Sequence, residues 1–342
     1  MYSDETDKVL LDDAFPAAPA GVPWCCGMPR GWLALSDHEN APTRVVLWDP
    51  SSGAEIALPP LRSVLQVFLS EDPLAAPPRH HGWMAFASQR RGCVAQKMHF
   101  WRPRDDAWSL MMLGRYDSTV RVDSVAFHDG KVFFTDYNHV LVIYDIINAA
   151  APPTLVRELN LQHVVNPLCR CPNFHIARAT HVVACCDDGD LLLVVIHGRD
   201  HPCFAEIYRP ADWTAKRLEL GDRVTDLGGH ALFLGRGDAF ALRAEDFPWI
   251  RRNCVYFLPH GQLAQLYWLL VFDLESGVLE RHPCPQKHKE EGRKEMVALF
   301  LVLPQEALLL QGVIYCLHTQ SRLEFSTKHV VRIPMKGALM CV

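Results

Sequence analysis

Two groups of cysteine and histidine residues carry the side chains that a structural zinc site needs. They are Cys169, Cys171, His175 and His181, and His197, His201 and Cys203. Structural zinc sites usually contain two ligand pairs, with about two to four residues inside each pair. The first two cysteines are only one residue apart, and the second group has no second pair. We therefore predict loop and core residues here, with no metal site and no cofactor.

Two charged stretches resemble ligand motifs but have the composition of turns. Residues 187–190 (D-D-G-D) resemble the start of a calcium-binding loop, but the glutamate that completes such a loop is missing and apolar residues follow at once. Residues 236–238 (R-G-D) spell an adhesion signal, but they lie between two apolar runs where the chain must turn. We interpret both stretches as turns between strands.

The sequence lacks the motifs of the common enzyme classes. It contains no Gly-x-Ser-x-Gly elbow, no phosphate-binding glycine loop and no His-Glu-x-x-His pair. Most aspartates and glutamates fall at expected turns, where solvation explains them. We therefore predict a protein that is not an enzyme, and we nominate no catalytic, cofactor-binding, metal-binding or other binding residues.

The composition is that of a folded protein without a nucleic-acid-binding surface. Hydrophobic residues make up 49% of the 342 residues and charged residues 21%, which supplies the material for a core. The formal net charge is −5, whereas nucleic-acid-binding domains show a surplus of lysine and arginine. We expect an unknown protein as the partner, and no nucleic acid.

The cysteines and the first residues indicate a reducing compartment. Several of the 12 cysteines are adjacent, as in Cys25 with Cys26 and Cys185 with Cys186, and adjacent cysteines rarely pair without strain. Residues 1–20 are acidic where a secretory signal is basic, and they lack its continuous apolar stretch. We predict reduced thiols and a cytoplasmic or nuclear protein.

One segment has the hydrophobicity of a membrane span but not its continuity. Residues 296–317 are mostly apolar, but Pro304 and Glu306 interrupt them near their middle. An ionisable residue at the centre of a bilayer is costly. We expect a buried strand pair or a short helix there, and no membrane.

Five copies of one pattern predict the architecture that must position any site. In each copy an aromatic residue ends an apolar run, a polar turn follows, and a second extended stretch begins. The copies are Trp48-Asp49-Pro50, Trp101-Arg102-Pro103, Tyr144-Asp145-Ile146, Tyr208-Arg209-Pro210 and Phe272-Asp273-Leu274. Their irregular spacing is close to the length of one propeller blade, about 40–50 residues. The pattern predicts an all-β propeller of five to seven blades, because each sheet leaves an apolar face that only a neighbouring blade covers.

The short apolar runs between turn residues fit strands better than helices. The central unit is the clearest, with an Asp-Gly hairpin turn at residues 128–131 and a second turn at residues 136–139. We predict a flexible leader over residues 1–22 and the propeller over residues 23–285. Residues 286–342 form a divergent C-terminal segment, which is either part of the closing blade or an appended segment with little structure of its own.

Several stretches are similar to the KIB-type β-propeller family of plants, a domain of unknown function. The similar stretches are G-W-L-A-L at 31–35, L-W-D-P-S-S-G at 47–53, I-A-L-P at 56–59, F-H-D-G-K-V-F at 127–133, L-F-L-G at 232–235, F-A-L at 240–242, A-E-D-F-P at 244–248 and N-C-V-Y-F at 253–257. The resemblance covers residues 31–285. It implies a kelch-like propeller.

The resemblance also implies a function. Propellers of this family often follow an F-box, a short helical module that recruits a ubiquitin-ligase scaffold while the propeller holds the target protein. No such module is expected before Trp24, which argues against the ligase scaffold as a partner. We therefore predict a non-catalytic protein-binding propeller that resembles the substrate-recognition part of plant F-box proteins.

Two alternatives remain open. The protein could be a small-ligand sensor or an enzyme that uses the axial channel of the propeller, which carboxylates or histidines with perturbed pKa values at one end of the channel would favour. It could also be a degenerate paralogue without retained activity, which the missing F-box and the divergent C-terminal segment both permit.

Overall fold

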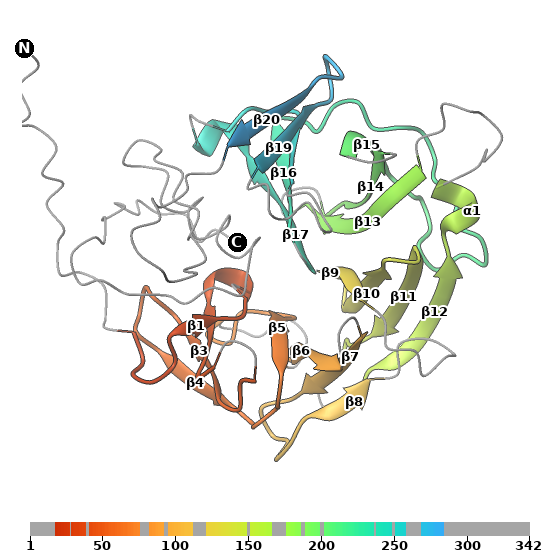
Figure 1. Ribbon diagram of the computed structural model, residues 1–342. Helices are drawn as coiled ribbons and strands as arrows, with labels where there is room; N and C mark the ends of the chain where they lie inside the picture. Colours follow the sequence, from red (N-terminus) through yellow and green to blue (C-terminus); the bar gives the residue numbers. More distant parts are fainter. Residues whose placement is uncertain are drawn as a thin grey trace, which may run out of the picture.

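Strands account for nearly all of the regular structure. The computed structural model describes residues 18–27, 29–38, 41–75, 82–91, 95–111, 121–148, 151–165, 176–185, 189–198, 202–235, 237–247, 250–257 and 268–283. Its helical segments are η1 (Pro29–Gly31), α1 (Gln162–Val165) and η2 (Ala244–Asp246). In this part of the chain, no helix is long and apolar enough to cross a membrane. The sheets stand around a common centre, so the predicted all-β propeller is confirmed (Figure 1).

The first two blades are simple four-stranded antiparallel sheets with their strands in chain order. Blade 1 consists of β1 (Trp24–Cys25), β2 (Leu33–Ser36), β3 (Val45–Trp48) and β4 (Glu55–Leu58). Blade 2 consists of β5 (Val64–Leu69), β6 (Ala85–Arg91), β7 (Ala95–Trp101) and β8 (Ser109–Met111).

The next two blades follow the same plan. Blade 3 consists of β9 (Val122–His128), β10 (Lys131–Asp136), β11 (Val140–Asp145) and β12 (Thr154–Asn160). Blade 4 consists of β13 (Ile176–Ala184), β14 (Leu191–Gly198) and β15 (Pro202–Tyr208), with a single bridge from Tyr208 to Arg223. The predicted Asp-Gly hairpin joins β9 to β10, where Asp129 (φ 46°) and Gly130 (φ 64°) have the positive angles of a type I′ turn.

Blade 5 departs from this plan. Its strands are β16 (His230–Leu234), β17 (Gly237–Arg243), β18 (Cys254–Phe257), β19 (Trp268–Asp273) and β20 (Leu279–Pro283), in the order β17-β16-β18-β19-β20. The segment that contains η2 carries the chain around the hairpin, so β18 runs parallel to β16. β17 is thereby placed at the centre of the ring, where it pairs in parallel with both β9 and β13 (Figure 1).

The aromatic residue of each repeat lies at or one residue before the end of a strand. These strands are β3, β7, β11, β15 and β19, and in blades 1, 2, 3 and 5 the following turn leads to the outermost strand. Blades 1 and 5 use the same turn: Gly53 donates its N–H to the Asp49 carbonyl, and Gly277 donates to the Asp273 carbonyl. Both glycines have positive φ, 75° and 69°. The repeat therefore marks the blades as predicted.

Apolar side chains fill the interfaces between neighbouring blades. Buried residues that lie in a shared cluster across such an interface are Leu47 and Val67 for blades 1 and 2, Phe86 and Phe134 for blades 2 and 3, Ile143 and Leu193 for blades 3 and 4, and Val194 and Leu232 for blades 4 and 5. Leu193 and Val194 are adjacent in β14 but pack against opposite neighbours, because side chains alternate between the two faces of a strand. Blades 2, 3 and 4 thus cover both of their faces by stacking, and blades 1 and 5 each cover one face in this way.

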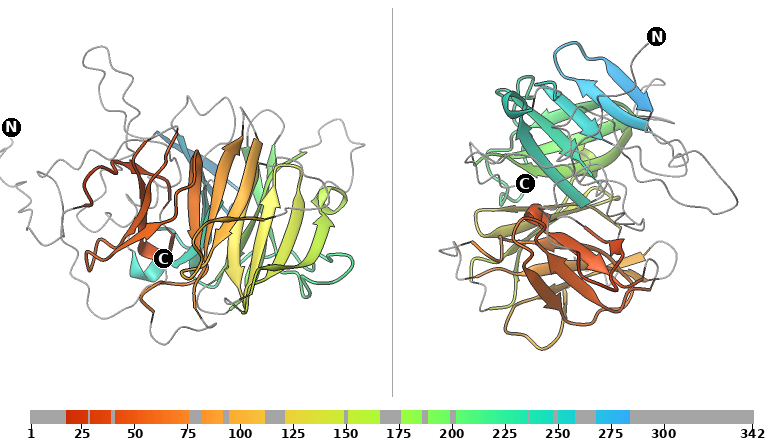
Figure 2. Two further views of the ribbon diagram at one scale, coloured as in Figure 1. Left: turned by 90° about the horizontal axis from the view of Figure 1, so that it is seen from below. Right: turned by 90° about the vertical axis from the view of Figure 1, so that its left-hand side faces the viewer.

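The turns alternate between two faces of the propeller. The aromatic-turn repeats and the β9–β10 hairpin lie on one face, which we call the motif face. The β2–β3, β6–β7 and β10–β11 connections lie on the other, which we call the Tyr137 face after the half-exposed residue in its β10–β11 turn. The strands run from one face to the other (Figure 2). The predicted limits at residues 22 and 285 and the proposed character of residues 286–342 stay predictions, because residues 1–17 and 284–342 lie outside the described part.

Candidate functional site

Arg121 and Tyr137 form an exposed pair on the Tyr137 face. The guanidinium carbon of Arg121 lies 5.9 Å from the centre of the Tyr137 ring, and the Tyr137 N–H donates to the Arg121 carbonyl at 3.2 Å. Arg121 directly precedes β9, and Tyr137 directly follows β10. The antiparallel pairing of these two strands, in which Val122 faces Asp136, brings the pair together. Tyr137 keeps 49% of its surface exposed.

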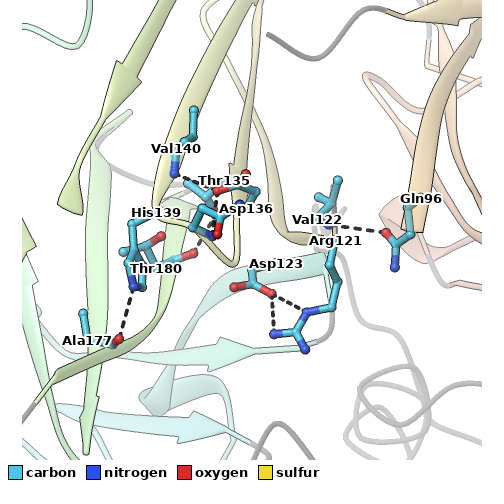
Figure 3. A network of polar contacts seen from close by, with 11 residues as sticks. Gln96, Arg121, Val122, Asp123, Thr135, Asp136, His139, Val140, Ala177 and Thr180 are labelled. Atoms are coloured by element: carbon cyan, nitrogen blue, oxygen red, sulfur yellow. Dashed lines mark hydrogen bonds and ion pairs between the residues drawn. The ribbon is translucent and has the colours of Figure 1, made fainter. Parts of the chain in front are cut away.

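The buried carboxylate of Asp123 binds Arg121 on the side that faces the interior of the blade. Arg121 donates from Nε and Nη2 to Oδ1 of Asp123, at 3.2 and 3.1 Å (Figure 3). Asp123 is only 1% exposed, whereas a third of the Arg121 side chain reaches solvent. A buried charge needs a partner, and the arginine both neutralises the carboxylate and presents its own outer edge. The position of Arg121 is therefore fixed from inside the blade.

Asp136 shapes the turn that carries Tyr137. Its Oδ1 accepts the N–H groups of Asn138 at 2.9 Å and Val140 at 2.7 Å. Burial disfavours the ionised form and raises the pKa of Asp136 from 3.8 to about 6, and the nearby negative charge of Asp123 acts in the same direction. The carboxylate is thus a structural acceptor that titrates in a mildly acidic range.

Side-chain hydrogen bonds tie this turn and blade 3 to β13 of blade 4. His139 is buried, and its Nε2 donates to the Ala177 carbonyl at 3.1 Å. Because a carbonyl only accepts, this contact sets the tautomer, while burial lowers the pKa of His139. Thr135 Oγ1 also donates to the Thr180 carbonyl at 2.6 Å (Figure 3). The site therefore rests on two blades.

The chemistry of these polar groups favours a structural role, in which they hold the Arg121–Tyr137 pair in place, over a catalytic role. A carboxyl group with a pKa near 6 beside a neutral imidazole has the proton affinity that acid–base chemistry uses. However, Asp136 accepts two amides of its own turn, and Asp123 binds Arg121. Within the described ranges, no group of three or more His, Cys, Asp or Glu could hold a metal ion. The polar network is best explained as a rigid base for the Arg121–Tyr137 pair.

Asp136→Asn tests the titration of the turn. The folded protein binds the Asp136 proton more tightly than the unfolded chain, so the contribution of this group to stability falls as pH rises between 3.8 and about 6. The asparagine does not titrate. The free energy of unfolding of the variant minus that of the wild type should therefore rise by on the order of 2 kcal/mol from pH 4 to pH 7, measured by urea unfolding. A pH-independent difference would contradict the assignment.

The structure separates the residues of the two cysteine–histidine groups. His181 is buried in β13, but Cys169, Cys171 and His175 lie outside the described residues. The imidazole of His197 contacts the Glu206 carboxylate, with 2.8 Å between Nε2 and Oε2. The same ring stacks on that of Phe204, with ring centres 4.7 Å apart. Cys203 belongs to β15, and His201 lies outside the described part. His197 thus has a carboxylate partner, and the absence of a zinc site stays a prediction.

The two charged turn motifs have different outcomes. Residues 187–190 fall between β13 and β14, which pair antiparallel, so the hairpin interpretation is confirmed; residues 187 and 188 themselves lie outside the described part. The turn assigned to residues 236–238 is wrong for its last two members. Gly237 and Asp238 open β17 and pair with Ser124 and Val125 of β9. Pairing with a distant strand extends β17 in a way that local turn chemistry does not reveal.

Sequence analysis missed Arg121, Asp123 and Tyr137. The turn that contains Tyr137 was predicted, but no local feature distinguishes it from the other turns. Arg121 and Asp123 stand two positions apart at the start of a strand, which places them on one face. That spacing could have indicated an ion pair, although it does not show which residue the arginine contacts next.

Three comparisons relate the chain to known proteins. A family described as the KIB1-4 beta-propeller matches residues 2–288. Among solved structures, the chain is similar to the Cps50 (Swd1) β-propeller domain of Myceliophteria thermophila, at 12% identity over 73% of this chain and 69% of that chain, with a TM-score of 0.36. It is also similar to a chain of the mitotic checkpoint complex, at 11% identity over 82% and 72%, with a TM-score of 0.38. No curated protein matches the chain significantly.

Proposed function

Because this chain belongs to the KIB1-4 β-propeller family, we propose that it is a non-catalytic module that holds another protein on its Tyr137 face. The observation that carries the proposal is the Arg121–Tyr137 pair. Tyrosine and arginine are among the residue types most enriched in binding hot spots. Here they stack on each other at the surface, beside the innermost strands of the propeller.

The surroundings of this pair favour binding because they reduce the conformational entropy that its side chains would lose on association. Ordering a long side chain on association costs about 0.5–1.5 kcal/mol. Asp123 already holds the Arg121 guanidinium, and the Asp136 hydrogen bonds already shape the Tyr137 turn. Less freedom is then lost when a partner arrives. A preorganised aromatic and a positively charged edge suit a polar protein surface.

A second candidate is a small-ligand sensor at the same end of the axis. The raised pKa of Asp136, next to Asp123 and His139, is the specific observation in its favour. The hydrogen bonds that engage both carboxylates within the blade count against it. The relation to a ubiquitin ligase also stays a proposal, and recovery of the ligase scaffold with the protein would support it.

A comparative pull-down tests the proposed function. The wild type, Tyr137→Ala and the control Ile147→Ala are used as baits in extracts of plant tissue, and bound proteins are quantified by mass spectrometry. Ile147 is 51% exposed and lies on the motif face. We expect at least one protein that the wild type and Ile147→Ala recover equally and that Tyr137→Ala recovers about tenfold less, as for loss of a hot-spot residue.

The same experiment can refute the proposal. A set of bound proteins that Tyr137→Ala leaves unchanged would remove the Tyr137 face from consideration. Recovery of no specific protein, together with turnover or tight binding of a small molecule that Asp136→Asn abolishes, would favour the sensor instead. Circular dichroism of each variant verifies that it is folded.

A further inference from the structure

Five basic residues follow one another across blades 1 to 3 on the Tyr137 face. We call them the basic arc: Arg44, Arg62, Arg90, Lys97 and Arg121. Arg44 and Arg62 lie in connections between strands, Arg90 and Lys97 lie at the adjoining ends of β6 and β7, and Arg121 precedes β9. Each position belongs to the same face because the strands alternate in direction.

Hydrogen bonds between the connections show that the arc is continuous. Ser63, next to Arg62, donates its N–H to the Pro42 carbonyl near Arg44, and its own carbonyl accepts the Arg90 N–H. Gln96, next to Lys97, accepts the Val122 N–H beside Arg121 (Figure 3). The arc therefore ends at the Arg121–Tyr137 pair.

The two faces differ in how their basic residues are paired with carboxylates. On the motif face, five basic side chains pair with carboxylates nearby, namely Arg102 with Asp105, Lys131 with Asp129, Arg209 with Asp190, Arg243 with Glu245, and Arg251 with Glu280, whereas Arg104 and Arg252 are exposed without such a pair among the described residues. On the Tyr137 face, Arg44 and Arg62 are exposed and form no ion pair with any described residue. The Tyr137 face therefore presents exposed positive charge without a described ion-pair partner at two successive connections between strands.

The charge of the basic arc is opposite in sign to the net charge of the whole chain. The arc has five positive side chains, and the described carboxylates along it are Asp37, Asp123 and Asp136, which leaves a local charge of about +2 at neutral pH. The full sequence carries −5. A local field opposite to the net charge attracts ligands of complementary charge to that place. A charge of about +2 is small beside the roughly six to ten phosphate contacts that DNA-binding proteins make, which favours a peptide.

We propose that the Tyr137 face binds an acidic, extended segment of its partner protein, whose carboxylates contact the basic arc while one residue packs on Tyr137. This rests on the proposed function, since it names the kind of protein segment that the same face holds. Arginine binds carboxylates through paired N–H donors. The arc crosses three blades, so a segment without compact structure of its own can contact all of it.

Charge reversal tests this inference. Binding of a fluorescein-labelled oligoglutamate peptide is measured by fluorescence anisotropy at low ionic strength for the full chain, for Arg44→Glu/Arg62→Glu and for the control Arg104→Glu/Arg252→Glu. The control makes the same charge change at two exposed residues of the motif face. We expect the arc variant to bind at least about tenfold more weakly and the control to stay within about twofold of the wild type. Binding should also weaken with added salt.

Several results would overturn the inference. Equal losses in both double variants would show a general effect of net charge, and absence of oligoglutamate binding would remove the arc as an acceptor. Tighter binding of an oligonucleotide of equal charge, or of phosphatidylserine vesicles, would assign the arc to another class of partner. If Tyr137→Ala loses a partner protein that Arg44→Glu/Arg62→Glu retains, the proposed function stands and the acidic segment does not.

Discussion

Replacing Phe86 with alanine should lower the free energy of unfolding by about 3–5 kcal/mol. Phe86 is fully buried in β6, and its ring lies 5.4 Å from that of Phe127 and 6.1 Å from that of Phe134, centre to centre. Both of these rings belong to blade 3. The substitution therefore removes apolar burial and two aromatic contacts across the interface of blades 2 and 3. Urea unfolding followed by tryptophan fluorescence measures the loss.

Leu155→Ala is the matched control for this prediction. Leu155 lies in the outermost strand of blade 3 and is 51% exposed, so its truncation should change stability by no more than about 0.5 kcal/mol. An equally small effect of Phe86→Ala would mean that blades 2 and 3 do not pack as described. The radial stacking of the blades would then be in question.

Phe233→Ala should have an effect of similar size, about 3–5 kcal/mol, in the rearranged blade 5. Phe233 is 1% exposed in β16, and its ring stacks on those of Phe240 and Tyr256, with centres 5.2 and 4.7 Å apart. These three rings join the central strand β17 to β16 and β18. The loss is again measured by urea unfolding.

Val278→Ala provides the comparison within the same blade. Val278 is 51% exposed in the β19–β20 turn, and its truncation should leave stability nearly unchanged. The m value is the slope of the free energy of unfolding against urea concentration. A large loss of stability in Phe233→Ala with an unchanged m value would show that blade 5 unfolds with the rest of the ring. A reduced m value, with the free energy of unfolding of the variant otherwise close to that of the wild type, would show that blade 5 unfolds separately.

The blades could be predicted because their signals are local. Alternating apolar residues define the strands, and glycines such as Gly53 and Gly130 supply the positive φ angles of the turns. The family was recognised from short stretches such as residues 253–257, and the family match confirms it. The parallel pairing of β16 with β18 was missed, because antiparallel and parallel neighbours have the same residue pattern within so short a strand.

The candidate site was predictable only in part. The turn at residues 136–139 follows from its composition, and the structure confirms it between β10 and β11. Its contact with Arg121 depends on the register between β9 and β10, and the ties from Thr135 and His139 to blade 4 depend on how blades pack. Such contacts join residues that are far apart in sequence.

The order of residues was enough to predict antiparallel blades with an aromatic-turn repeat and the family to which the chain belongs. The stacking of Tyr137 on an arginine that a buried carboxylate holds, and the alignment of basic residues from three blades on one face, became visible only in the folded chain. Strand alternation and turn geometry can be predicted because they are set by neighbouring residues. Placement around the axis is set by packing and hydrogen bonds between blades, which the order of residues along the chain does not contain.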